Sequence, residues 1–255
     1  MISFFRKIRQ KLLSQNRVTR YLVYALGEIF LVVIGILIAL QVNNWNEGRK
    51  LNKQKAVLLE NLEQDFEENQ KRLDLIIGFL NDREKYARHI LALLDSLPEK
   101  LDSIPTVFAL ERAGFVHYFN PTQPTYEEMK SSGTLSLISN KELKRVMSSY
   151  QTFLEYSYRI EEKNSDLIQS FADRILRYMD PDFGTVNITD NESKAYAGVH
   201  FDLKAMSNDT EIHYLLNLIV HKSIVEAGYK DRIFRPRLKY ILELIKEEKK
   251  IASNE

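Results

Sequence analysis

An uninterrupted apolar segment near the start of the chain dominates its hydrophobic and polar pattern. Residues 22–42 read LVYALGEIFLVVIGILIALQV and contain one ionisable side chain, Glu28. At about 1.5 Å per helical residue the segment spans roughly 31 Å, close to the thickness of the hydrocarbon core of a bilayer. Two tyrosines lie at one end and the only tryptophan, Trp45, at the other, as in the aromatic belts of membrane proteins. The pattern predicts a transmembrane helix over residues 21–43.

Beyond this segment, apolar residues recur at helical spacing over most of the chain. From Leu58 to residue 96 the steps are mostly threes and fours, with Asn69 in one position of the apolar seam. This spacing predicts one long amphipathic helix or two nearly collinear helices. The element can continue from the membrane segment, because only Gly48 weakens the junction. We expect it to break near Gly78 or to fold into a bundle.

Capping signals and helix-breaking residues divide the rest of the chain into further helices. Thr125 and Ser139 each open a capping-box pattern, and Gly133 lies where a C-terminal cap belongs. The predicted helices run from Ser103 to Gly114, from Thr125 to Gly133, from Ser139 to about Leu176, from Asp209 to Gly228 and from Pro236 to about Glu247.

The least periodic stretch is 181–208, which is rich in Asn, Asp, Ser, Thr and Gly. We expect a loop or a small irregular insert there. No segment has a convincing strand pattern, and Gly and Pro together supply few tight turns. The predicted fold class is therefore mainly α, with an N-terminal transmembrane helix followed by a helical-bundle-like domain over residues 44–255.

Charge separates the chain into a basic arm and a slightly acidic body. The 255 residues have a net charge of +1, but residues 1–20 carry six basic side chains and no acidic one. Since cytoplasmic flanks of membrane spans are rich in Lys and Arg, we expect residues 1–20 to be a cytoplasmic arm and 44–255 to be exported. This arrangement predicts a single-pass protein of the inner (cytoplasmic) membrane with a periplasmic domain. An acidic body is a poor match to phosphate backbones, so nucleic acid is not an expected partner.

Two other interpretations of the apolar segment are a buried core helix and a cleaved signal peptide. The segment is longer than the apolar region of a signal peptide, and Ala39-Leu40-Gln41 is a poor cleavage site. An uncleaved signal-anchor, with the lipid bilayer as its partner, is therefore favoured.

Several residues in and beside the span are candidates for helix packing or for function: Gly27, Glu28, Gly35, Ala39, Asn43, Asn44 and Trp45. Gly27, Gly35 and Ala39 fall roughly on one stripe, which would let a second helix approach and form a homo-oligomer. A carboxylate in hydrocarbon costs several kcal/mol unless it is protonated or paired, so we interpret Glu28 as a snorkelled or packing residue. A proton relay is the alternative. The two asparagines can cap the helix end or bond a neighbouring helix.

No motif with a known catalytic mechanism is present. The sequence has no phosphate-binding loop, G-x-S-x-G, H-E-x-x-H or dinucleotide fingerprint, and it contains no Cys. The five histidines lack the spacing of a metal site, so neither a metal nor another cofactor is expected.

Aromatic side chains crowd one predicted helix at Tyr150, Phe153, Tyr156 and Tyr158. Such a cluster can line a groove for a sugar or a peptide, or it can belong to the core and rim of a bundle. The leading expectation is a non-enzymatic interaction or scaffold module of the envelope, with another envelope protein or a second copy as its partner. The alternatives are a periplasmic ligand-binding protein or enzyme that uses this groove, and a proton-coupled membrane subunit that uses Glu28.

Two stretches carry a resemblance to a known family. One is the N-terminal stretch, which comprises the arm FFRKIR at residues 4–9, the apolar span and the exit sequence Asn43-Asn44-Trp45-Asn46-Glu47 with Arg49-Lys50. The other is TYEEMKSSG at residues 125–133, followed by Leu137-Ile138-Ser139. Both resemble a family of uncharacterised single-pass membrane proteins from Gram-negative bacteria, a domain of unknown function. The resemblance implies an envelope location and a helical architecture, and it carries over no catalytic residue.

Overall fold

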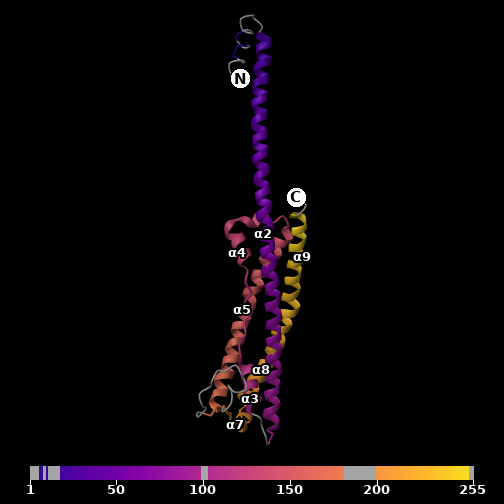
Figure 1. Ribbon diagram of the computed structural model, residues 1–255. Helices are drawn as coiled ribbons and strands as arrows, with labels where there is room; N and C mark the ends of the chain where they lie inside the picture. Colours follow the sequence, from indigo (N-terminus) through magenta and orange to yellow (C-terminus); the bar gives the residue numbers. More distant parts are fainter. Residues whose placement is uncertain (1–5, 8–9, 11–17, 99–102, 181–198, 253–255) are drawn as a thin grey trace. The chain divides into compact units, whose positions relative to one another are not determined.

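The computed structural model describes residues 6–7, 10, 18–98, 103–180 and 199–252 (Figure 1). These residues are mainly helical and contain no strand, apart from an isolated bridge between Met179 and Phe201, which confirms the mainly α class. The chain divides into two units, Met1–Ala56 with Glu255 and Val57–Asn254. Most of the predicted basic arm, residues 1–20, lies outside the described residues, and so does 181–198 of the predicted irregular stretch.

The longest element is helix α2, Val18–Ser96, which contains both the apolar segment and the amphipathic pattern that follows it. The helix continues through Gly48 and Gly78, so the expected break near Gly78 is wrong. A lone glycine costs a helix only about 1 kcal/mol relative to alanine. Apart from the adjoining backbone of α2 itself, no heavy atom lies within 4 Å of the position that a Cβ of Gly78 would take, so no packed neighbour forces a bend there.

The remaining elements follow in chain order. They are α3 (Ser103–Gly114), α4 (Pro124–Ser132), the 3₁₀ turn η1 (Thr134–Leu137), α5 (Lys141–Ile175), the 3₁₀ turn η2 (Leu176–Tyr178), α7 (Leu203–Ser207), α8 (Thr210–Tyr229), the π-helical turn η3 (Lys230–Phe234) and α9 (Arg235–Ala252). The predicted end of a helix at Gly228 is wrong, because α8 passes through this glycine and continues through η3 into α9 without a loop.

Both predicted capping boxes are displaced in the structure. Pro124 occupies the start of α4, which places Thr125 inside the helix, and the Thr125 backbone N–H donates to Asp65 Oδ2 at 3.0 Å. Helix α5 is capped by Asn140 rather than Ser139, since Asn140 Oδ1 accepts from the backbone N–H of Leu143 at 3.0 Å. The predicted cap at Gly133 is confirmed, because its φ of 77° lies in the left-handed region that glycine adopts without strain.

Unit Val57–Asn254 has two apolar cores. Each is built by the three long helical segments that run along the unit, namely residues 57–96 of α2, helix α5 and the continuous α8–η3–α9 (Figure 1). The first core takes buried residues from 58–80 of α2, 143–150 of α5 and 234–245 of η3 and α9. The second takes them from 87–94 of α2, 168–175 of α5 and 212–220 of α8. Helices α2 and α5 therefore run in the same direction along the unit, and α8–α9 runs in the opposite direction.

The connection between α3 and α4 returns along α2 to make this parallel arrangement. Three side chains of α2 bond the backbone of this connection and of the first turn of α4. Arg72 donates to the carbonyl of Asn120 at 3.1 Å, and Asn69 bonds both the carbonyl and the N–H of Thr122 at 2.8 and 2.9 Å. Asp65 accepts from the N–H of Thr125. Asn69 is fully buried, so this polar position of the predicted seam satisfies a backbone that would otherwise lack partners.

The start of α8 is fastened to the end of α5 through Asp209. Its Oδ1 caps the N–H of Glu211 at 3.0 Å, while Oδ2 accepts from Arg174 Nε and from the Tyr178 hydroxyl, both at 2.6 Å. The hydrogen bond from Arg174, with those from Tyr178 and the Glu211 N–H, holds the pKa of Asp209 well below its ordinary value.

Asp209→Asn should destabilise the protein at neutral pH, because asparagine keeps the cap and loses the charge. A carboxyl whose pKa is lowered by folding stabilises fully above its unfolded pKa of about 3.9, and this contribution is lost as the pH falls toward the folded value. The difference in urea midpoint between wild type and Asp209→Asn should therefore be constant above about pH 5 and shrink below about pH 4. A difference that grows on acidification would contradict this role.

Candidate functional site

The apolar part of α2 exposes large side chains all around the helix. Most large hydrophobic side chains between Leu22 and Val42 are 44–70% exposed, Ile34 is half-buried, and none of the most apolar window is buried. Within the described residues this is the one helix long and apolar enough to cross a membrane. Gly27 and Gly35 have nothing within 4 Å of their Cβ positions, Ala39 is exposed, and Glu28 is half-buried.

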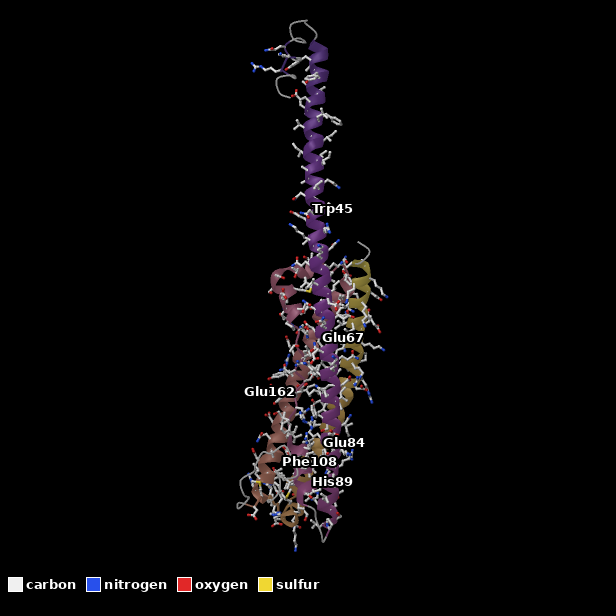
Figure 2. The ribbon with its side chains drawn as sticks, viewed as in Figure 1. Trp45, Glu67, Glu84, His89, Phe108 and Glu162 are labelled. Atoms are coloured by element: carbon white, nitrogen blue, oxygen red, sulfur yellow. The ribbon has the colours of Figure 1, made fainter. Side chains whose placement is uncertain are left out.

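The exit from this segment carries specific polar contacts. Asn43 donates to Glu47 Oε1 at 3.3 Å, one helical turn further on, and Asn44 is exposed. Trp45 is 67% exposed, and the Arg49 guanidinium lies over its ring, 6.0 Å from the centroid. Figure 2 shows Trp45 on a stretch of α2 whose side chains stand out on all sides.

The four aromatic candidates on α5 face different surroundings. Tyr150 is fully buried in the first core, where its ring packs edge-on against Phe66 and Phe234. Burial raises the pKa of its hydroxyl well above the ordinary value. Phe153 is half-buried beneath the Arg237 guanidinium, 3.5 Å from the ring centroid.

The other two aromatic candidates are exposed. Tyr156 packs edge-on against Tyr229, and Tyr158 lies beside Tyr118. Tyr158 also lines an open pocket of about 450 Å³, together with residues from the connection that precedes α4. The structure thus brings Tyr158 to a pocket wall and takes Tyr150 into the core.

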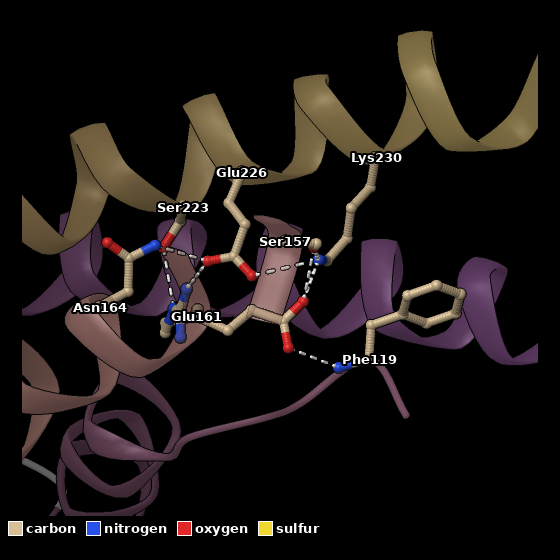
Figure 3. A network of polar contacts seen from close by, with 8 residues as sticks. Phe119, Ser157, Glu161, Asn164, Ser223, Glu226 and Lys230 are labelled. Atoms are coloured by element: carbon tan, nitrogen blue, oxygen red, sulfur yellow. Dashed lines mark hydrogen bonds and ion pairs between the residues drawn. The ribbon is translucent and has the colours of Figure 1, made fainter. Parts of the chain in front are cut away.

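A network of buried charges lies between the helices of unit Val57–Asn254, and sequence reasoning missed it (Figure 3). Lys230, the first residue of η3, is fully buried and pairs with Glu161 Oε1 of α5. Its ammonium also donates to Ser157 Oγ at 3.1 Å and lies 3.6 Å from Glu226 Oε1. Glu161 uses its other oxygen to accept the backbone N–H of Phe119 at 3.1 Å.

The second half of the network centres on Glu226. Its Oε2 accepts from Asn164 Nδ2 at 2.9 Å and pairs with Arg83 Nη2 at 3.4 Å. Arg83 Nε donates to Ser223 Oγ at 2.9 Å. Burial lowers the pKa of Arg83, and Glu226 opposes this effect.

The network is balanced in charge and closed to solvent. Two cations, Arg83 and Lys230, face two carboxylates, Glu161 and Glu226, and all the side chains in it are at most 5% exposed. A substrate cannot reach groups this deeply buried. The physical role of the network is therefore to orient three helices, since a buried charge is tolerated only when its partners are in place.

The signal for this network was present in the sequence as polar residues at seam positions. Arg83 stands three residues after the buried Leu80 and four before the buried Ala87. Glu161 likewise recurs at helical spacing with the other buried residues of α5. Matching opposite charges at such positions on separate helices would have indicated a buried ionic layer.

Lys230→Met should lower the free energy of unfolding by about 3–5 kcal/mol, because it leaves a carboxylate buried without its cation. Adding Glu161→Gln to this variant should recover part of the loss, since the uncompensated charge is removed. Urea denaturation followed by circular dichroism measures both effects.

Arg145→Gln is the matched control, since it removes a cation from an exposed ion pair with Glu142 and should change stability little. A Lys230→Met variant as stable as this control would contradict a structural role for the network.

The described residues offer no grouping of three or more His, Asp or Glu side chains that could hold a metal ion. His117 stacks on Phe79 with their centroids 4.0 Å apart. Burial, with the nearby charges of Arg83 and Arg112, lowers the pKa of this imidazole, so it is neutral at pH 7.

Comparison with known proteins identifies a family and no individual relative. A model described as a family of unknown function, DUF6090, matches residues 28–192, which is more than half of the chain. The matched region includes Glu28, the exit sequence around Trp45 and all four aromatic candidates on α5. Neither the curated proteins nor the solved structures contain a significant match. The chain therefore belongs to the DUF6090 family of unknown function.

Proposed function

We propose that the protein is anchored in a membrane by residues 21–43 and that its helical unit, Val57–Asn254, acts as a non-enzymatic interaction or scaffold module. The observation that carries the anchor is the exposed apolar surface of α2 over residues 22–42, in which Glu28 is the only ionisable residue. Each Å² of such surface left in water is unfavourable by roughly 25 cal/mol, so a helix of this kind requires an apolar environment.

The interaction role is supported by how unit Val57–Asn254 uses its polar groups. The four charges of the buried network neutralise one another. The buried carboxylate of Glu161 also bonds the backbone N–H of Phe119, and that of Glu248 bonds the N–H groups of Ser139 and Asn140. Groups engaged in this way hold the helices together and are not available to a substrate. The exposed aromatic side chains Tyr156 and Tyr158 then remain for contact with another protein.

The proposed location is the inner membrane, with the N-terminus in the cytoplasm and the helical unit in the periplasm. Six basic side chains precede the span within residues 1–20, whereas residues 43–255 carry an excess of acidic groups. Cytoplasmic loops of membrane proteins carry an excess of Lys and Arg, and this excess sets the orientation.

Two charges placed in the apolar segment should release the protein from the membrane. Leu31→Lys combined with Leu37→Lys adds roughly 5–7 kcal/mol to insertion, at about 2.5–3.5 kcal/mol for each lysine near the centre of a span. The double variant should move from the pellet to the supernatant after alkaline carbonate extraction.

Leu75→Lys is the matched control, because Leu75 is 62% exposed on the same helix but lies outside the apolar segment. This variant should remain in the pellet as the wild type does. Retention of the double variant, or equal release of the control, would contradict anchoring by residues 21–43.

Orientation is tested by reporter fusions at two positions. Alkaline phosphatase, which is active only after export, should be active when it is fused after residue 60, and a cytoplasmically active fluorescent protein should be dark there. Both results should reverse for a fusion placed before the span. Phosphatase activity confined to the fusion before the span would overturn the proposed topology.

A further inference from the structure

The helical turns that follow the apolar segment carry exposed cations next to Trp45. Arg49, Lys50 and Lys53 are exposed on α2, and no residue that the structure describes forms an ion pair with them. Arg49 makes one contact, over the ring of Trp45. These residues belong to unit Met1–Ala56, so their arrangement follows from α2 alone.

Helical geometry gathers these cations on one side of α2. At about 100° per residue, Arg49, Lys53 and Lys50 lie about 40°, 80° and 140° around the axis from Trp45. The nearest carboxylate, Glu47, lies about 200° away and is bonded by Asn43. Lys55 lies about 80° to the other side of Trp45 and is buried. The charged side chains on this exposed arc, which also contains the neutral Asn46, are therefore all cations.

The direction of the side chains brings this arc toward the apolar segment. In an α-helix each Cα–Cβ bond leans toward the N-terminus, so side chains at 49–53 lean back toward the end of the span. The position of the Arg49 guanidinium over Trp45, one turn earlier, is an instance of this lean. Long cationic side chains can then reach the headgroup layer while Trp45 occupies the boundary with the hydrocarbon.

We propose that Trp45, Arg49, Lys50 and Lys53 form a binding surface for the phosphate groups of anionic phospholipids in the leaflet at the C-terminal end of the span. The occupant is identified by charge complementarity, because three cations without ion-pair partners adjoin a surface that requires hydrocarbon. The inference rests on the proposed membrane insertion and adds a lipid class to it. The surface attracts anionic lipid and leaves zwitterionic lipid at its bulk proportion.

Trp45 provides the reporter for the test, since it is the only tryptophan. The full-length protein is reconstituted into vesicles of phosphatidylcholine and phosphatidylglycerol in which one lipid at a time is brominated near the carbonyl end of an acyl chain. Brominated phosphatidylglycerol should quench Trp45 at least about twofold more than brominated phosphatidylcholine at equal mole fraction. The preference should vanish in about 1 M salt, where charges are screened within about 3 Å.

The variant Arg49→Gln/Lys50→Gln/Lys53→Gln should lose the preference and keep its helicity. Its matched control, Lys141→Gln/Lys222→Gln/Lys239→Gln, removes three exposed cations from other helices and should keep the preference. Equal quenching of the wild type by both lipids, or loss of the preference in the control as well, overturns the headgroup surface and leaves insertion intact. Absence of quenching by either lipid contradicts insertion itself and overturns both proposals.

Discussion

The buried ionic layer of Arg83, Glu226, Lys230 and Glu161 is the constraint on which the rest of unit Val57–Asn254 depends. On α2 and α5 this layer separates residues of the first apolar core from residues of the second. On α8–η3–α9 it lies where the two cores meet, with Ala227 of the first core between Glu226 and Lys230. Apolar side chains attract one another without directional bonds, so apolar packing specifies the register of two helices less strictly than a buried ion pair does. A buried charge loses several kcal/mol when its partner moves away. The layer therefore fixes how the three long segments are aligned along their axes, and this alignment determines the packing of both cores.

The π-helical turn is a consequence of that register. The inward-facing residues Glu226, Lys230, Phe234 and Leu238 follow one another in three steps of four. A regular α-helix, with 3.6 residues per turn, would rotate this face by about 120° over those twelve residues. The wider turn of η3 at Lys230–Phe234 reduces the rotation, so Lys230 can reach Glu161 while α9 still presents Leu238 to the first core. The helical path therefore continues from α8 through η3 into α9, and no helix ends at Gly228.

Local signals in the sequence predicted the local features of this fold and no more. The left-handed cap at Gly133 and the bounds of α3 depend on a few neighbouring residues, and they were predictable for that reason. The starts of α4 and α5 were misplaced, because their N-H groups are bound in part by Asp65 and Glu248, which come from distant segments. The network was missed because its partners on different helices are 62–143 residues apart. The contact between Trp45 and Arg49 differs from the network in this respect. The two residues are one turn apart on one helix, so their contact follows from spacing alone.

The buried cations of the network and the exposed cations beside Trp45 differ in what stabilises their charge. Arg83 and Lys230 are buried, and the chain supplies each with carboxylates, because no solvent can stabilise them there. Arg49, Lys50 and Lys53 are exposed beside an apolar surface, and the chain places its nearest carboxylate on another side of the helix. Water alone would satisfy these three cations, as it does exposed lysines elsewhere on the protein. Their position is what distinguishes them: along α2 the exposed apolar segment is followed, about two turns later, by three exposed cations. A bilayer with anionic headgroups presents an apolar region and a charged region in the same order.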